Sequence, residues 1–199
     1  MANSARFDPT QITAAILAGG EGRRVDGRDK GLLLVSGRPL VAYAAAPLRD
    51  TVSRVIVCAN RNRDRYAEYG DVFADDESGF RGPLAGIATA LAHCATPWLL
   101  TVPVDCPAPP QSVAARLYAA VGNSAVVVAY DGTRRQPLFA LYRSGLLESA
   151  QAALSANLPV WRWQDDCGAV EADFSDRADA FDNLNSDEEI RAWEQRSHE

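Results

Sequence analysis

The chain has 199 residues, of which 47% are hydrophobic and 23% are charged, with 26 acidic against 20 basic side chains. This is the composition of an ordinary globular protein, and a chain of this length can bury enough apolar surface to fold without disulfides or structural metals. The net charge of −6 argues against a general nucleic-acid binder, which would carry a basic face. We therefore expect one domain over residues 1–199 and no nucleic acid among its partners.

Cysteines and apolar stretches bear on the location of the protein. Its 4 cysteines lie far apart, and only 2 histidines could join them, which leaves almost no material for a zinc site and is typical of reduced cytosolic thiols. The uncharged stretch 82–104 contains two glycines and three prolines, which favours a helix followed by a buried strand over a membrane span. The first ten residues lack the apolar run of a secretory signal. We expect a cytoplasmic protein without membrane contact.

Short apolar strands alternate with helical segments along the chain. Continuous β-branched runs are typical of strands covered on both faces, and the helices between them supply the covers. The sequence therefore predicts an α/β fold with a mostly parallel sheet, whose ligands bind outside the carboxyl ends of the strands. Strands are predicted at 13–18, 55–57, 72–73, 98–102, 125–129 and 138–142, and helices at 40–46, 84–92, 113–121 and 146–154.

An acidic segment lies near the end of the sequence. Residues 164–190 hold ten acidic side chains and one base, Arg177. We interpret this run as a solvated face, with an interaction tail as the alternative. Ser186 followed by Glu189 is a capping box, which predicts a helix through 190–193.

The first candidate site is the turn after the first strand. Gly19 and Gly20 allow backbone N–H groups to approach an anion, and Arg23, Arg24 and Lys30 supply charge for a polyphosphate. The turn is not a Walker A loop, because the lysine is preceded by aspartate and followed by glycine. It is not a dinucleotide fingerprint either, because a valine stands where a third small residue is required.

Lys30 is the single lysine of a chain that has 19 arginines. A compact ammonium differs most from a guanidinium where a point charge must fit between phosphate oxygens or beside a base. Chance survival of one lysine is the alternative, and its place ten residues after the glycines favours a function.

Asp105 is the second candidate, at the carboxyl end of an apolar strand and between Pro103 and Pro107. A carboxylate placed there suits Mg²⁺, which binds through one or two carboxylates and substrate phosphates. The alternative is a turn aspartate that binds its own backbone. Asp75, after the strand at 72–73, is a weaker candidate.

The residues at 17–31, Leu-Ala-Gly-Gly followed by Arg and then Asp-Lys-Gly, resemble the nucleotide-binding signature of the MobA family, the molybdenum cofactor guanylyltransferases. The glycine signature is shared with other nucleotidylyltransferases, whereas Asp-Lys-Gly and the late Phe-x-Asn-x-Asn are more particular to this family. The resemblance covers nearly the whole chain, continuing at 57–61, 82–86, 103–107, 136–141 and 181–186.

This resemblance implies a Rossmann-like three-layer α/β/α nucleotidyltransferase fold. It also implies transfer of GMP from GTP to the terminal phosphate of molybdopterin, with Mg²⁺ bound at Asp105 and release of pyrophosphate. Catalysis needs no protein nucleophile, only alignment and charge neutralisation, for which Arg24, Lys30 and Asp105 are the expected residues. Asn183 and Asn185 match a pair on the pterin side of the family. The implied GTP contacts are Leu17, Ala18, Gly19, Lys30, Asp75 and Asp105.

Three positions depart from the family pattern. Val25 stands at a usual methionine, Gln136 at a usual histidine and Cys58 at a usual asparagine that contacts the nucleotide. Cysteine is a poor hydrogen-bonding substitute, and Asn60 is the residue that could replace the missing amide.

Two other functions stay open at this point. One is a nucleotidylyltransferase that uses CTP or a sugar 1-phosphate, with the same fold and metal. The other is a non-catalytic carrier of the pterin cofactor that docks transiently to molybdoenzymes or their chaperones. The acidic segment and the tryptophans could serve such docking, although core packing is the commoner use of tryptophan. The tryptophans are Trp98, Trp161, Trp163 and Trp193.

Overall fold

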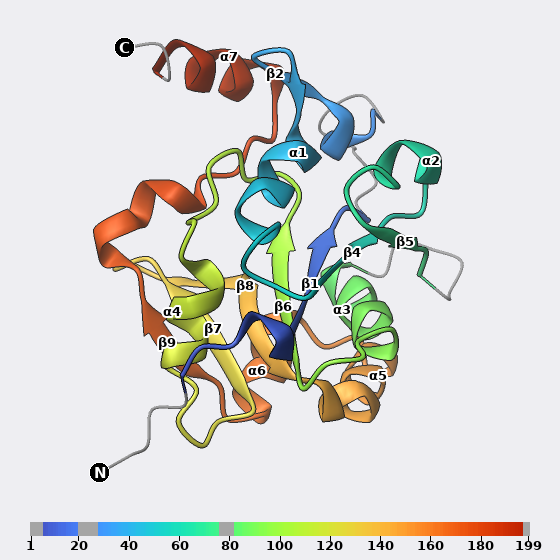
Figure 1. Cartoon of the computed structure of the whole chain (residues 1–199), viewed down its shortest axis with the longest axis vertical. Helices are drawn as coiled ribbons and strands as arrows, with labels where there is room; N and C mark the ends of the chain where they lie inside the picture. Colours follow the sequence, from blue (N-terminus) through green and yellow to red (C-terminus); the bar gives the residue numbers. More distant parts are fainter. Residues whose placement is uncertain (1–5, 20–27, 76–81, 197–199) are drawn as a thin grey trace.

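The structure, a computed structural model, describes residues 6–19, 28–75 and 82–196 (Figure 1). Its centre is a seven-stranded sheet in the order β5-β4-β1-β6-β8-β7-β9. All neighbouring strands pair in parallel except at β8, which runs antiparallel to β6 and β7. The strands are β1 (Ile12–Leu17), β4 (Arg54–Cys58), β5 (Asp71–Phe73), β6 (Trp98–Pro103), β7 (Val126–Tyr130), β8 (Arg135–Arg143) and β9 (Val170–Asp173).

Helices cover both faces of this sheet. One core contains α1 (Leu40–Ala45) and α4 (Val113–Ala119) against one face. The other contains α3 (Pro83–Ala92), α5 (Leu147–Ser155) and α6 (Val160–Asp166) against the opposite face. The mostly parallel three-layer α/β/α architecture is therefore confirmed. Short 3₁₀ turns connect these elements at Pro9–Gln11, Lys30–Leu32, Ala46–Leu48, Ser144–Leu146 and Ser175–Phe181.

Three small elements gather beyond the carboxyl ends of β1 and β6. The hairpin of β2 (Leu34–Val35) and β3 (Arg38–Pro39) lies beside α7 (Asp187–Arg196), although the two are far apart in sequence (Figure 1). A separate apolar cluster joins them, and it includes Val35, Leu184 and Ile190. The third element is α2 (Arg63–Tyr66).

The predicted Ser186 cap is present at the start of α7, with the reciprocal bond of Glu189 shifted by one residue. The backbone N–H of Glu189 donates to Ser186 Oγ at 3.2 Å. The Glu189 carboxylate accepts from the backbone N–H of Asn185. Acceptors so placed satisfy donors that a helix N-terminus leaves unpaired.

The acidic segment contains two elements that sequence patterns did not reveal. All ten of its acidic side chains are exposed, which confirms the predicted solvated face. The segment nevertheless includes the second half of α6 and all of β9, and it buries Phe174 and Phe181 in the core. Strand β9 was missed because only Ala172 of its four residues is buried, so it shows no apolar run.

The uncharged stretch 82–104 forms α3 and β6, as predicted. Among the described residues, no helix has the length and apolar character needed to cross a membrane. All four cysteines are free thiols.

Candidate functional site

Lys30 and Asp105 meet at the carboxyl end of β6. The Lys30 ammonium donates to Asp105 Oδ2 at 2.5 Å and to Asn185 Oδ1 at 2.7 Å. Each side chain of the ion pair is 20% exposed. The structure thus brings together the solitary lysine, the proline-flanked carboxylate and one of the two late asparagines, which come from three distant parts of the chain.

Asp105 is only half satisfied by these contacts. Its backbone carbonyl accepts from the N–H of Leu184 at 2.9 Å, which fastens the segment before α7 to the end of β6. Its second carboxylate oxygen, Oδ1, is buried and has no hydrogen-bond partner among residues 6–19, 28–75 and 82–196. Because buried polar atoms are nearly always paired, an unpaired carboxylate oxygen at a strand end indicates a place for a cation.

Asp75 lies in a second cluster, after β5. Asn60 donates its amide to Asp75 Oδ2 at 3.0 Å and accepts from the Asp75 N–H at 2.8 Å. Thr89 of α3 donates to Asp75 Oδ1 at 3.2 Å. Both carboxylate oxygens are therefore paired. Thr89 was not predicted from the sequence, because a threonine in a buried helix carries no sequence signal of a hydrogen bond to a distant carboxylate.

The end of β1 lies between the two clusters, because β1 pairs with β4 on one side and β6 on the other. The N–H of Ala18 donates to Cys58 O at 2.9 Å, and Leu17 O accepts from Val104 at 3.2 Å. A Cβ added to Gly19 would stand 3.5 Å from Asp75 Oδ2. Leu17, Ala18 and Gly19 thus reach the common edge, whereas Gly20, Arg23, Arg24 and Val25 lie outside the described residues.

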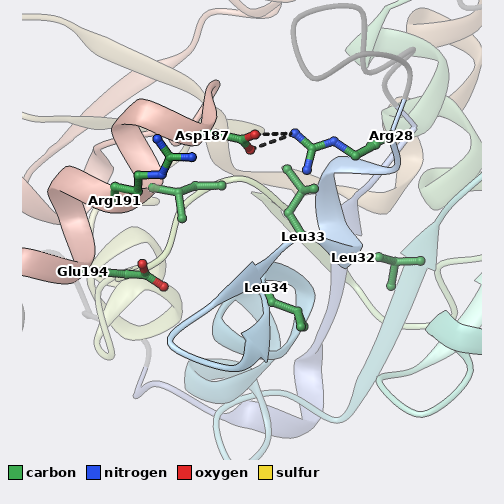
Figure 2. A pocket seen from close by; sticks show the side chains of 8 residues that line it. Arg28, Leu32, Leu33, Leu34, Asp187, Arg191 and Glu194 are labelled. Carbon is green, nitrogen blue, oxygen red and sulfur yellow. Dashed lines mark hydrogen bonds and ion pairs between the residues drawn. The ribbon is translucent and has the colours of Figure 1, made fainter.

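A pocket of about 450 Å³ lies between the segment 28–34 and helix α7. Arg28 reaches toward Asp187 of α7, and one guanidinium nitrogen donates to both carboxylate oxygens, at 2.7 and 2.8 Å (Figure 2). Asn183, two residues before Asn185, is exposed. Its backbone carbonyl accepts from the Asn185 side-chain amide at 3.5 Å. The lining combines Leu32, Leu33 and Leu34 with Asp187, Arg191 and Glu194 of α7.

Cys58 and Gln136, which depart from the family pattern, both point into the protein. The Cys58 thiol is buried and donates to Gly86 O at 3.3 Å, and burial raises its pKa to about 12. It is therefore a neutral packing residue, and the amide at this corner belongs to Asn60. Gln136 donates to Asp131 Oδ2 at 2.6 Å in the turn between β7 and β8.

Most of the tryptophans pack into the protein, as the commoner use predicts. Trp98 and Trp163 are buried. Trp193 of α7 makes an edge contact with Tyr43. Trp161, at 52% exposed, is the exception.

Tyr66 and Asn62 also reach this site and were not found from the sequence. Tyr66 donates its hydroxyl to Asp29 Oδ1, and Asn62 donates its amide to Asp29 Oδ2 at 2.8 Å. Tyr66 is fully buried. The available signal was weak, since Tyr66 is only the first aromatic residue after a run of polar ones at 60–65.

Known proteins are similar in sequence to nearly the whole chain. The model of the MobA-like NTP transferase domain matches residues 14–167. A molybdenum cofactor guanylyltransferase of Shewanella pealeana is 40% identical over 183 residues, covering 90% of this chain and 92% of that protein. One of Vibrio vulnificus is 38% identical, covering 95% and 98%.

Solved structures agree on the fold. The molybdopterin-guanine dinucleotide biosynthesis protein A of Archaeoglobus fulgidus superposes with a TM-score of 0.75 at 19% identity, covering 94% of this chain and 98% of that one. The 2-C-methyl-D-erythritol 4-phosphate cytidylyltransferase of Thermus thermophilus superposes at 0.68 with 18% identity, covering 93% and 98%. The family-model match and the guanylyltransferase relatives decide the membership: the chain belongs to the MobA-like NTP transferase family.

Proposed function

We propose that this chain is a molybdenum cofactor guanylyltransferase that transfers GMP from GTP to molybdopterin and releases pyrophosphate. The observation that carries the proposal is the three-way contact of Lys30 with Asp105 and Asn185. It joins the nucleotide signature, the expected metal carboxylate and an asparagine expected on the pterin side. The guanylyltransferase relatives at about 40% identity support the same activity.

In the proposed reaction, an oxygen of the terminal phosphate of molybdopterin attacks the α-phosphorus of GTP. The new bond joins that oxygen to the α-phosphorus, and the bond from the α-phosphorus to the bridging oxygen of the β-phosphate breaks. The bonding electrons leave with pyrophosphate. Because the acceptor phosphate is itself the nucleophile, the protein needs only to align the substrates and to neutralise charge.

The residues present fit a magnesium ion held by Asp105. Mg²⁺ commonly takes one or two carboxylates together with substrate phosphates and water. The buried, unpaired Oδ1 of Asp105 offers one such ligand. Among the described residues no group of three or more acidic, histidine or cysteine side chains offers a cage, so the substrate would have to supply further ligands. Bound there, the ion would neutralise phosphate charge.

The remaining roles are those that the family resemblance implies. The backbone at Leu17, Ala18 and Gly19 would approach the nucleotide, with Asp75 contacting it from the end of β5, two strands along the sheet. Lys30 would pair with phosphate oxygens, sharing with Arg24 the charge that develops on pyrophosphate. Asn183 and Asn185 would bind the acceptor. We place the reaction in the cytoplasm, in keeping with the free thiols.

The deciding experiment measures pyrophosphate release with molybdopterin and Mg²⁺ while GTP, CTP, ATP or UTP is supplied in turn. We expect release with GTP, together with molybdopterin guanine dinucleotide as product, and loss of both when EDTA removes the metal. Release with CTP instead would assign the chain to cytidylyl transfer. Tight molybdopterin binding without release from any triphosphate would favour the carrier.

A further inference from the structure

The residues directly before and after Lys30, Asp29 and Gly31, are both fixed by contacts with other parts of the chain. Asp29, the preceding residue, is the N-cap of the 3₁₀ turn Lys30–Leu32, yet its side chain does not cap that turn. An aspartate at an N-cap ordinarily accepts from its own helix. Here both carboxylate oxygens instead accept from the α2 region, one from Tyr66 and one from Asn62.

Asn62, like Asp29, binds a residue outside its own helix. It is the N-cap of α2 and makes no side-chain cap hydrogen bond to that helix. Its backbone adopts a left-handed conformation, with φ of 50°, which asparagine tolerates better than most residues. Two N-cap residues therefore bind each other rather than their own helices, which ties the Lys30 segment to α2.

Gly31, the residue after Lys30, is wedged in place. An added Cβ there would overlap the Tyr66 hydroxyl and would lie 2.7 Å from Val104 Cγ2. Only glycine allows so close an approach. Val104 directly precedes Asp105, so Gly31 packs tightly both against Tyr66 and against the residue next to the carboxylate partner of Lys30.

We infer that Tyr66 and Asn62 are positioning residues that hold Lys30 against Asp105 by anchoring Asp29. Both side chains donate to the residue before Lys30, and Tyr66 also packs against Gly31 after it, so they act on Lys30 through its neighbours. Burial and the neighbouring carboxylate of Asp29 raise the pKa of Tyr66, which keeps its hydroxyl protonated as a donor. A reactive group set by supporting contacts loses precision when one of them is removed.

The consequence for the nucleotide rests on the proposed function, but the positioning itself can be measured without turnover. Lys30 is the only lysine, so an amine-acylating reagent gives one lysine product, which peptide mass spectrometry separates from the α-amine. The full-length protein is labelled without nucleotide. The variants are Tyr66→Phe, which removes one hydroxyl, and Asn62→Gly, which keeps the left-handed backbone and removes the amide.

Two controls match these changes elsewhere in the chain. Tyr142→Phe removes the hydroxyl of another fully buried tyrosine, which accepts from Gln164 at 2.6 Å in the opposite core. Asn157→Gly removes an exposed amide at a φ of 54°. We expect several-fold faster labelling of Lys30 in the two anchor variants and wild-type rates in the controls. Wild-type rates in the anchor variants, or equal acceleration in the controls, would overturn the inference.

A second arm repeats the labelling with GTP and Mg²⁺. Protection of Lys30 in the wild type, weakened about tenfold in apparent affinity by Tyr66→Phe, is expected when the anchored lysine binds phosphate. If the first arm succeeds and no triphosphate protects the wild type, the proposed function fails while the anchoring of Lys30 stands. If GTP protects every variant with wild-type affinity and labelling without nucleotide is unchanged in the anchor variants, the inference fails.

Discussion

Asp105 and Asp75 both follow strands of one sheet, β6 and β5, which are separated by β4 and β1, and the sequence alone makes Asp75 the weaker candidate. Asp75 has both oxygens paired, with Asn60 and Thr89. Asp105 shares one oxygen with Lys30, and its other oxygen has no partner in the part of the chain that the structure describes. The difference separates two kinds of carboxylate. A saturated one holds its neighbours in place, and an unsaturated one is ready for a further ligand.

The largest expected effect comes from Asp105→Asn. Removing the negative charge should lower turnover about 10²- to 10³-fold, the range found when one group that stabilises transition-state charge is lost. GTP binding, measured by isothermal titration with Mg²⁺, should be retained in part because the glycine turn and Lys30 remain. Near-normal turnover in this variant would contradict the metal role of Asp105.

Lys30→Arg tests whether the contact with Asp105 needs a compact charge. The planar, longer guanidinium cannot occupy the place between Asp105 and Asn185 without displacing them, so kcat/KM for GTP should fall roughly tenfold to a hundredfold. The control is a cation swap at an exposed ion pair, Arg162→Lys beside Asp166, which should leave kcat/KM unchanged. Equal kinetics for the two variants would show that the single lysine is an accident of composition.

Asp75→Ala should act first on stability. It leaves Asn60 and Thr89 without their acceptor, so the free energy of unfolding should fall by about 1–3 kcal/mol in urea titrations. GTP affinity should weaken less than with Lys30→Arg if Asp75 mainly fixes its neighbours. A loss of turnover as large as that of Asp105→Asn, with unchanged stability, would reverse the two roles.

Asp131 sharpens the comparison as a carboxylate that binds its own turn. Burial opposes its charge, but hydrogen bonds from Thr133, Arg134 and Gln136 outweigh burial and lower its pKa well below the ordinary value. A depressed pKa stabilises the fold above the unfolded-state value of about 3.9, and this stability is lost as the pH falls below it. Asp131→Asn should therefore unfold more easily at pH 7 than wild type, with a smaller difference at pH 3. Guanylyl transfer should be unaffected.

The parallel half of the sheet could be predicted because its strands are continuous apolar runs, as at 98–102. Strand ends then placed Asp75 and Asp105 at one edge. Strand β9 could not be predicted, because acidic residues interrupt it, and helix α6 could not, because it is short and ends in two aspartates. The anchoring of Asp29 could not be predicted either, because its hydrogen bonds with Asn62 and Tyr66 produce no periodic pattern in the sequence. The contact between Lys30 and Asn185 spans 155 residues, and only the family resemblance associated the two.

That span also has a consequence for synthesis. Asn185, whose side-chain oxygen accepts from the Lys30 ammonium, is synthesised 155 residues after Lys30. All seven strands of the sheet and Asp105 are made before it. The contact that joins Lys30 to the segment before α7 therefore forms only after synthesis has passed the whole sheet.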